Sequence, residues 1–136
     1  MREIKFRQWD KRNRRFHYFG FDLGVDSVFT SPENPNRENF PVSQYTGLKD
    51  SKGVEIYEGD IVLLYGYEYR GDGSYEPTLA VTKWNDYDHG FMFKIITEVG
   101  ASHEVLMFEY TAEVIGSIDE NPELLGESDE DNTRIT

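Results

Sequence analysis

Polar and apolar residues alternate along many short segments of this chain, a pattern typical of half-buried strands rather than helices. Residues 3–9 (EIKFRQW) alternate at period two, and residues 15–21 return with aromatic side chains after the polar turn 10–13. Two such segments joined by a short polar turn predict an N-terminal β-hairpin. Residues 30–41 contain three prolines, which lack the N–H group that a sheet ladder needs, so we expect a loop there.

The most regular stretch of the sequence is QYTGLKDSKGVEIYEGDIVLL, residues 44–64. Its pattern predicts three short strands and two turns: strands at 44–48, 54–57 and 61–64, and turns at 49–53 and 58–60. Glu58 and Asp60 form a carboxylate pair of the kind that serves acid–base chemistry or holds a metal ion. A turn explains these residues more fully, because Gly59 can adopt a positive φ and Asp60 can accept backbone N–H groups. We therefore interpret the segment as scaffold.

Further strands are predicted toward the C-terminal end, at 79–84, 91–97, 105–110 and 114–118. The Gly- and Tyr-rich residues 66–77 predict a long loop at the tip of an extended hairpin, and residues 85–90 a turn-rich connector. Residues 121–125 (NPELL) predict a short helix with asparagine as N-cap and proline in first position. The expected fold class is mainly β, α+β at most: an N-terminal β-hairpin, a small SH3-like or bent-sheet barrel and one short C-terminal helix.

The composition sets the expected class of protein. Hydrophobic residues make up 38% of the 136 residues, which is enough for one packed core. We expect a single domain over residues 1–125 and a disordered acidic tail over 126–136. The absence of cysteine excludes disulfides and cysteine-based zinc sites. The sequence shows neither a membrane-length apolar run nor a signal-peptide pattern, so we expect a cytoplasmic protein with no membrane contact.

The net charge of −12 is unevenly distributed. Residues 1–15 contain seven basic and two acidic residues, whereas the rest of the chain is strongly acidic. The overall acidity argues against binding along a nucleic-acid duplex, because neutralising phosphates needs a broad basic surface. The basic segment can instead contact an acidic partner, including a second copy of the chain.

Two aromatic-rich segments are candidate binding surfaces. In the predicted N-terminal hairpin, basic and aromatic residues interleave; this suits stacking on single-stranded nucleic acid, contact with an acidic protein, or simple protection of a solvated edge strand. Tyrosines at period two between residues 65 and 69 predict an aromatic stripe on an exposed arm that packs on another subunit. The candidate partner-binding residues are Arg2, Lys5, Arg7, Trp9, Arg12, Arg14, Arg15, Tyr67 and Tyr69.

No catalytic or cofactor pattern stands out in the sequence. His17, His89 and His103 do not have the spacing of metal ligands, although His89 lies beside two aspartates in a predicted turn. No serine lies in a nucleophile motif, and no glycine-rich segment forms a phosphate-binding loop. Arg70, Gly71 and Asp72 match the cell-adhesion tripeptide, which we interpret as a chance turn. We therefore expect a protein that is not an enzyme and uses no cofactor or metal.

Three segments occur in a characteristic order: REIKFRQWD near the start, QYTGLKDSKGVEIYEGDIV in the centre and EVIGSIDENPELL near the end. In order and spacing they resemble the YopX-like proteins of bacteriophages and prophages, mostly of Firmicutes. The resemblance spans residues 2–125 and is weakest over 65–112. It implies a phage or prophage origin and a place in the cytoplasm of the infected or lysogenic bacterial host. The family offers no established activity and no catalytic residues to carry over.

The sequence thus favours an accessory protein that acts by protein–protein binding. We expect a homo-oligomer that contacts a host or phage protein through the candidate residues. The alternative is a nucleic-acid-binding regulator that uses the basic N-terminal hairpin, which the net charge disfavours.

Overall fold

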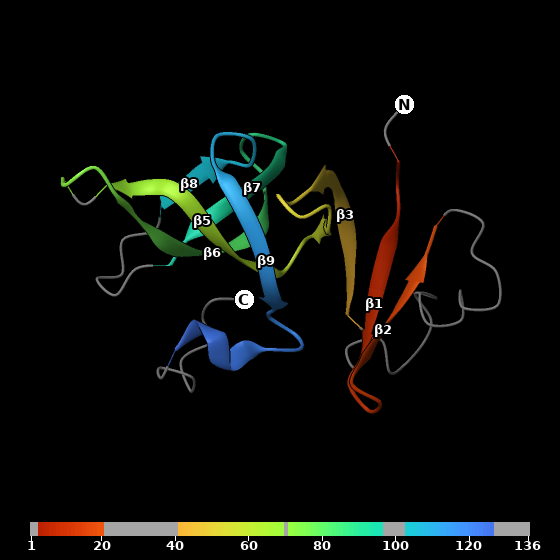
Figure 1. Ribbon diagram of the computed structural model, residues 1–136. Coiled ribbons are helices and arrows are strands. Elements are labelled where there is room, and N and C mark those ends of the chain that lie inside the picture. Colours follow the sequence, from red (N-terminus) through yellow and green to blue (C-terminus); the bar gives the residue numbers. More distant parts are fainter. Residues whose placement is uncertain (1–2, 21–40, 70, 97–102, 127–136) are drawn as a thin grey trace.

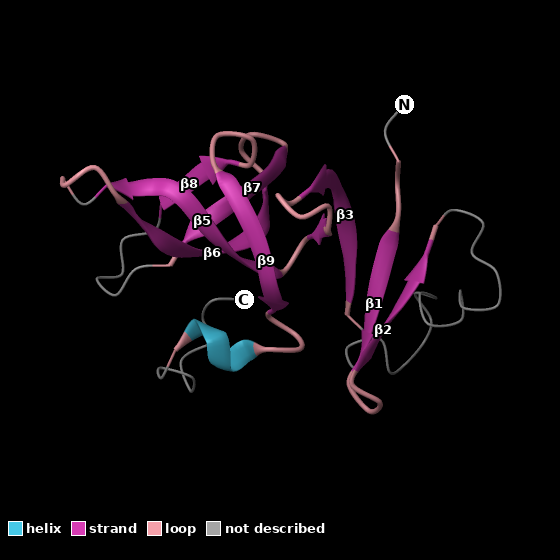
Figure 2. Cartoon of the chain, viewed as in Figure 1, coloured by secondary structure: helices cyan, strands magenta, loops and turns pink. Residues whose placement is uncertain are grey.

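The computed structural model describes residues 3–20, 41–69, 71–96 and 103–126. Nearly all of its regular structure is antiparallel β-sheet, in two sheets that lie side by side (Figures 1 and 2). The prediction of a mainly β fold is confirmed. No helix within the described residues is long and apolar enough to cross a membrane. Apart from Gly126, the predicted acidic tail lies outside these residues.

The first sheet has the strand order β2-β1-β3-β4. Its strands are β1 (Phe6–Asp10), β2 (Arg15–Phe19), β3 (Val42–Lys49) and β4 (Glu55–Tyr57). The predicted N-terminal hairpin is confirmed, with β1 and β2 paired from Phe6 opposite Phe19 to Asp10 opposite Arg15. The hairpin turn is held by Asp10, whose carboxylate accepts the backbone N–H groups of Arg12 and Asn13 at 3.0 and 3.2 Å.

The second sheet has the strand order β8-β7-β6-β5-β9 and curls into a half-barrel (Figure 1). Its strands are β5 (Asp60–Tyr69), β6 (Tyr75–Asn85), β7 (Gly90–Ile95), β8 (His103–Leu106) and β9 (Thr111–Ser117). Inside the curl lies a fully buried cluster that includes Val62, Leu64 and Phe93. Each such side chain contributes about 1.5–3 kcal/mol relative to an exposed one. The core therefore belongs mainly to the half-barrel.

Two predicted segments differ from the structure. The predicted loop 66–77 is in fact mostly strand, because β5 continues to Tyr69 and β6 begins at Tyr75; the extended hairpin is correct, but its tip is short. The predicted strand 105–110 ends at Leu106 and continues as a turn. The turn contains Met107 and Phe108, two adjacent large apolar residues. On a strand they could not both face the core, because successive side chains point to opposite faces.

The two sheets are tied together by the turns of the segment 44–64. Asp50 accepts backbone N–H groups of Lys52 and Val54 in its own turn, and that of Val114 on β9. Gly59 has a φ of 91°, its N–H donates to Thr82, and its carbonyl accepts from Ile118. The interpretation of residues 58–60 as a turn is confirmed.

The C-terminal helical element is a single 3-10 turn, η3 (Pro122–Leu125). Proline occupies its first turn as predicted, and Leu125 packs against Ile61 and Val81 on the outer face of the half-barrel. Asn121 occupies the N-cap position as predicted, but its side chain caps no N–H group of η3. Its Oδ1 instead accepts the backbone N–H of Ser117 at 3.3 Å and so fixes the loop that follows β9.

Candidate functional site

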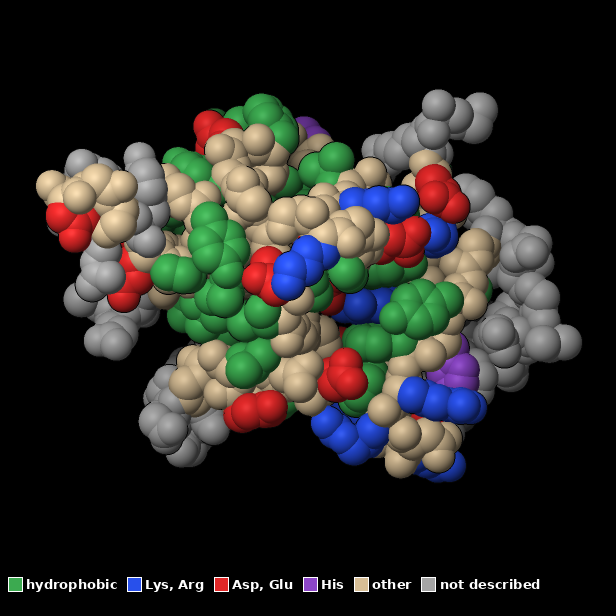
Figure 3. All heavy atoms as spheres, viewed as in Figure 1, with side chains coloured by type: hydrophobic (Ala, Val, Ile, Leu, Met, Phe, Trp, Pro, Cys, Tyr) green, Lys and Arg blue, Asp and Glu red, His purple; other side chains and the backbone are tan. Residues whose placement is uncertain are grey.

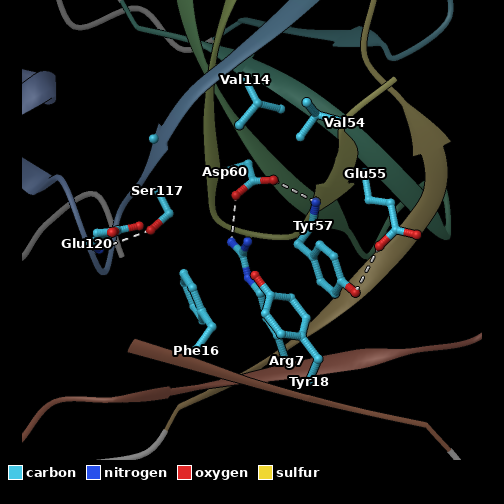
Figure 4. Close-up of a pocket in the computed structure, with 11 residues that line it drawn as sticks. Arg7, Phe16, Tyr18, Val54, Glu55, Tyr57, Asp60, Val114, Ser117 and Glu120 are labelled. Atoms are coloured by element: carbon cyan, nitrogen blue, oxygen red, sulfur yellow. Dashed lines mark hydrogen bonds and ion pairs between the residues drawn. The ribbon is translucent and has the colours of Figure 1, made fainter. Parts of the chain in front are cut away.

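A cleft of about 330 Å³ lies between the two sheets, where β1, β2 and β4 face β9 and the loop after it (Figure 4). Arg7 reaches from β1 to the start of β5, and its Nη2 donates to Asp60 Oδ1 at 2.6 Å. The backbone N–H of Tyr57 donates to the other oxygen of the Asp60 carboxylate at 2.8 Å. The side chains of Arg7 and Asp60 are only 7% and 2% exposed, so this is a buried ion pair that joins the sheets.

Aromatic rings enclose the guanidinium of Arg7. Its central carbon lies 3.9 Å from the ring centre of Phe16 and 4.7 Å from that of Tyr57, within the range of cation–π attraction. Burial raises the pKa of Asp60, while the charge of Arg7 acts in the opposite direction. Because each charge is neutralised by the other, the pair is a structural clamp rather than an acid–base couple.

The other basic candidates also contact the chain itself. Lys5 forms ion pairs with Glu3 and Glu55. Arg14 donates from Nη2 to the carbonyl oxygen of Glu120 at 3.0 Å, and its guanidinium lies 5.4 Å from the ring centre of Trp9. Of these contacts, the Lys5–Glu55 pair lies within the first sheet, and the bond from Arg14 to Glu120 joins the hairpin turn to the loop after β9.

Trp9 and Arg7 offer almost no surface to a partner, with 2% and 6% exposure. Their prediction as exposed partner-binding residues is therefore corrected: both lie between the sheets, and Trp9 packs against Phe16 at 4.8 Å. Arg12 and Arg15 are exposed at the hairpin turn, while Arg2 lies outside the described residues. Basic side chains gather around this turn at one end of the molecule (Figure 3).

The tyrosine stripe is divided between two faces of β5. The pairing of β5 with β6 shifts register between Leu64 and Glu68, and Gly66 there has a φ of 97°, which indicates a β-bulge. Tyr65 consequently stays at the surface, where its hydroxyl donates to Glu113. Tyr67 turns toward the core cluster and packs edge-on against the rings of His103 and Tyr110.

Tyr67 is thus half-buried within the chain. The backbone of Tyr69 ends β5, but its side chain lies outside the described set, so its predicted role in subunit contact stays a prediction. The structure places these tyrosines on the half-barrel, away from the basic hairpin turn (Figure 1). The two candidate surfaces therefore do not form one site.

Sequence reasoning missed a second hollowed surface, which we call the β3 groove. It consists of two hollows of about 410 and 300 Å³ that share Leu48 and Met107 in their walls. Trp84 and Phe91 line the first hollow, and Phe108 the second. The signal available in the sequence was the run of adjacent large apolar residues from 106 to 108, which strand alternation leaves unexplained.

The edges of the β3 groove carry large apolar side chains exposed to solvent. Phe108 is 77% exposed, Leu48 42% and Trp84 41%. Trp84 is held in place by a hydrogen bond from its indole Nε1 to Asp86 at 2.8 Å and by edge contact with Phe91. Trp84 is therefore a fixed apolar side chain at the edge of the groove.

The histidines do not converge on a metal site. Among the described residues, no group of three or more histidine and carboxylate side chains is placed to hold a metal ion. His17 lies beside Asp10 at 3.4 Å, His103 packs on a tyrosine ring, and His89 occupies the β6–β7 turn with a φ of 54°.

Comparison with known proteins agrees with this architecture. The model of the YopX protein family matches residues 5–126, nearly the whole chain. The chain belongs to the YopX family. No curated protein matches its sequence. The YopX chain is also similar in fold to a crystal structure of protein EF1440 from Enterococcus faecalis, with a TM-score of 0.53 and 24% identity over 93% of this chain and 100% of that one.

Proposed function

We propose that this YopX family member is a non-enzymatic accessory protein of a phage or prophage, and that it acts in the bacterial cytoplasm by binding another protein. The observation that carries the proposal is the β3 groove, where Phe108, Leu48 and Trp84 expose apolar surface around two adjoining hollows. Single exposed apolar residues are ordinary on protein surfaces, but several gathered around adjoining hollows are typical of an interaction site.

The proposal includes self-association of the chain. Its support is the charge distribution: Lys11, Arg12 and Arg15 are exposed at the hairpin turn, whereas the chain as a whole carries −12. A basic turn on one copy can attract the acidic surface of the next copy.

Sedimentation velocity tests the self-association. We expect a mass well above the 15.9 kDa of one chain at low salt, and a lower mass for the variant Arg12→Glu, Arg15→Glu. The control is Lys94→Glu, which reverses a charge on β7, away from the turn. A strict monomer at all concentrations contradicts self-association.

Affinity capture from host cells, with and without nuclease, tests the binding function itself. A partner protein that is retained after nuclease treatment supports the proposal. Captured protein that disappears with nuclease favours the second candidate, a nucleic-acid-binding regulator, for which the exposed Arg12 and Arg15 are the specific support. In that case the Arg12→Glu, Arg15→Glu variant should also abolish a salt-sensitive shift of single-stranded DNA.

A further inference from the structure

The two hollows of the β3 groove are adjacent, because Leu48 and Met107 line both of them. Its floor is apolar: the side chains of Ile56, Met107 and Ala112 are buried, with 2%, 8% and 6% exposure. Two adjoining apolar hollows with a shared wall match two large side chains carried side by side on one partner segment.

The backbone beside the groove suits an extended segment. The β1–β3 ladder extends to Tyr45, whose N–H donates to the carbonyl of Lys5. Over residues 46–49 the described part of the chain gives β3 a partner strand only on its β4 side, where the register shifts and Gly47 has a φ of 93°. Thr46, Gly47 and Leu48 of this stretch line the first hollow. A strand with one unpaired edge can accept an extended peptide through main-chain hydrogen bonds, while alternate side chains of the peptide enter pockets.

Charges around the groove select the partner. Asp86 and Asp88 are exposed in the turn that carries one wall, and Glu109 is exposed next to Phe108. Lys49 is the one lysine or arginine among the residues that line the two hollows. An acidic rim around an apolar floor is complementary to a segment whose apolar residues are flanked by lysine or arginine.

A second copy of the chain fits the groove poorly. Its groove would bring the same acidic rim into contact with this one, and like charges across an interface are unfavourable. Its basic turn has the right charge, but the two aromatic residues nearest that turn are covered: Trp9 is 2% exposed and Phe16 packs on the Arg7 guanidinium. Tyr18 on β2 is 57% exposed, so the turn and β2 offer one large exposed aromatic side chain to the two hollows.

We propose that the β3 groove binds an extended segment of a different protein, which carries two large apolar side chains at alternate positions flanked by lysine or arginine. This inference rests on the proposed binding function and specifies its partner. Phe108 and Trp84 are the anchors of the contact, and the acidic rim contributes selectivity.

Labelled octapeptides test the inference against the full chain. The first probe has two leucines two positions apart, flanked by lysines; the second has glutamates in place of the lysines. We expect the lysine-flanked peptide to bind, measured by fluorescence anisotropy, and the glutamate-flanked peptide to bind at least tenfold more weakly. Phe108→Ser should weaken binding by about tenfold or more, as for truncation of an aromatic anchor. Since Phe108 is 77% exposed, this variant should fold normally.

Two matched variants complete the design. Ile115→Ser removes an apolar side chain that is 36% exposed on β9, outside the groove, and should leave peptide binding unchanged. Asp88→Lys with Glu109→Lys should reverse the preference between the two peptides, because it reverses rim charges and leaves the hydrogen bond between Trp84 and Asp86 in place. Amide chemical shifts should change along residues 46–49 on peptide addition.

Three results overturn the inference. The first is absence of binding of either peptide at millimolar concentration, and the second is equal loss of affinity in Phe108→Ser and Ile115→Ser. The third is a fall in sedimenting mass in Phe108→Ser, which would make the groove an interface between copies. In the first two cases a nuclease-resistant partner from the capture experiment would still support the proposed function, so the two failures are distinguishable.

Discussion

Removing the charge of Arg7 should destabilise the fold more than any other single change among the hairpin's basic residues. The substitution Arg7→Met keeps the length and apolar stem of the side chain but leaves Asp60 buried without its counter-charge. Asp60 is 2% exposed, so water cannot replace the guanidinium. Breaking a buried pair in this way costs about 3–5 kcal/mol. The N–H of Tyr57 still donates to the Asp60 carboxylate, so we expect about 3 kcal/mol, the lower end of that range.

Urea unfolding of the wild type and the variant measures this loss, and a thermal melt should show a fall of roughly 10 °C for a chain of this length. The control is Arg15→Met, which removes an exposed cation from the neighbouring strand and should change the free energy of unfolding by no more than about 0.5 kcal/mol. Arg7→Met combined with Asp60→Asn should recover much of the loss, because no unpaired charge is then buried.

The loss of unfolding free energy in Arg7→Met should also depend on pH. Burial raises the pKa of Asp60 above the ordinary 3.8, and removal of Arg7 removes the main opposing charge. In Arg7→Met, the folded state therefore binds a proton more readily than the unfolded state. The deficit is full at pH values above the raised pKa and shrinks as the pH falls toward 3.8. A deficit below about 1 kcal/mol at neutral pH, or one that grows on acidification, would refute the clamp.

Three further predictions concern the turns and the close packing of the chain. Hydrogen bonds within the hairpin turn lower the pKa of Asp10 from 3.8 to about 2, and the bond from the side chain of Asn13 has the largest effect. The stability that this group contributes above pH 3.8 should therefore be lost as the pH falls toward 2, and Asp10→Asn should flatten that part of the urea-unfolding profile. Gly59→Val should lower the free energy of unfolding by about 1–2 kcal/mol or more, because a β-branched residue must adopt a positive φ; unchanged melting would contradict the turn. Gly116→Ala places a Cβ 2.6 Å from Asn121 Oδ1 and should shift the NMR signals of η3, whereas Gly90→Ala, with no atom nearer than 3.9 Å, should not.

The local structure of this chain follows from local sequence signals. The N-terminal hairpin, the turn at Gly59 and the proline at the start of η3 all depend on residues within a few positions of one another, and all three were predictable. The bulge at Gly66 was not, because a glycine between alternating tyrosines reads equally as an uninterrupted strand. Four residue steps along β5 there oppose two along β6, and these two extra residues bring Tyr67 from the predicted exposed stripe toward the core.

The candidate site was harder to predict because its contacts are distant in sequence. Arg7 and Asp60 are 53 positions apart, and no local pattern pairs a cation in a hairpin with an acid in a turn. Charge counting identified the basic segment correctly, but it could not separate cations that meet a partner from those that meet the same chain. The exposure of Phe108 was likewise hidden, since it depends on where β8 ends.

The chain's own use of its basic residues changes where a partner should be sought. Arg7 pairs with Asp60 on β5 and Arg14 donates to the carbonyl of Glu120 after β9, so these two cations join the hairpin to the second sheet. Lys5 pairs with Glu55 of its own sheet. A surface whose lysines and arginines are already paired within the chain binds a polyanion such as nucleic acid more weakly. The release of counter-ions from the polyanion requires cations that are free to contact it. The β3 groove is different, since Phe108, Leu48 and Trp84 around it remain 77%, 42% and 41% exposed. The binding energy of a protein–protein contact is concentrated in a few large side chains that become buried when the partner binds. The groove is therefore a better basis for partner recognition than the basic hairpin, even though the sequence drew attention to the hairpin first.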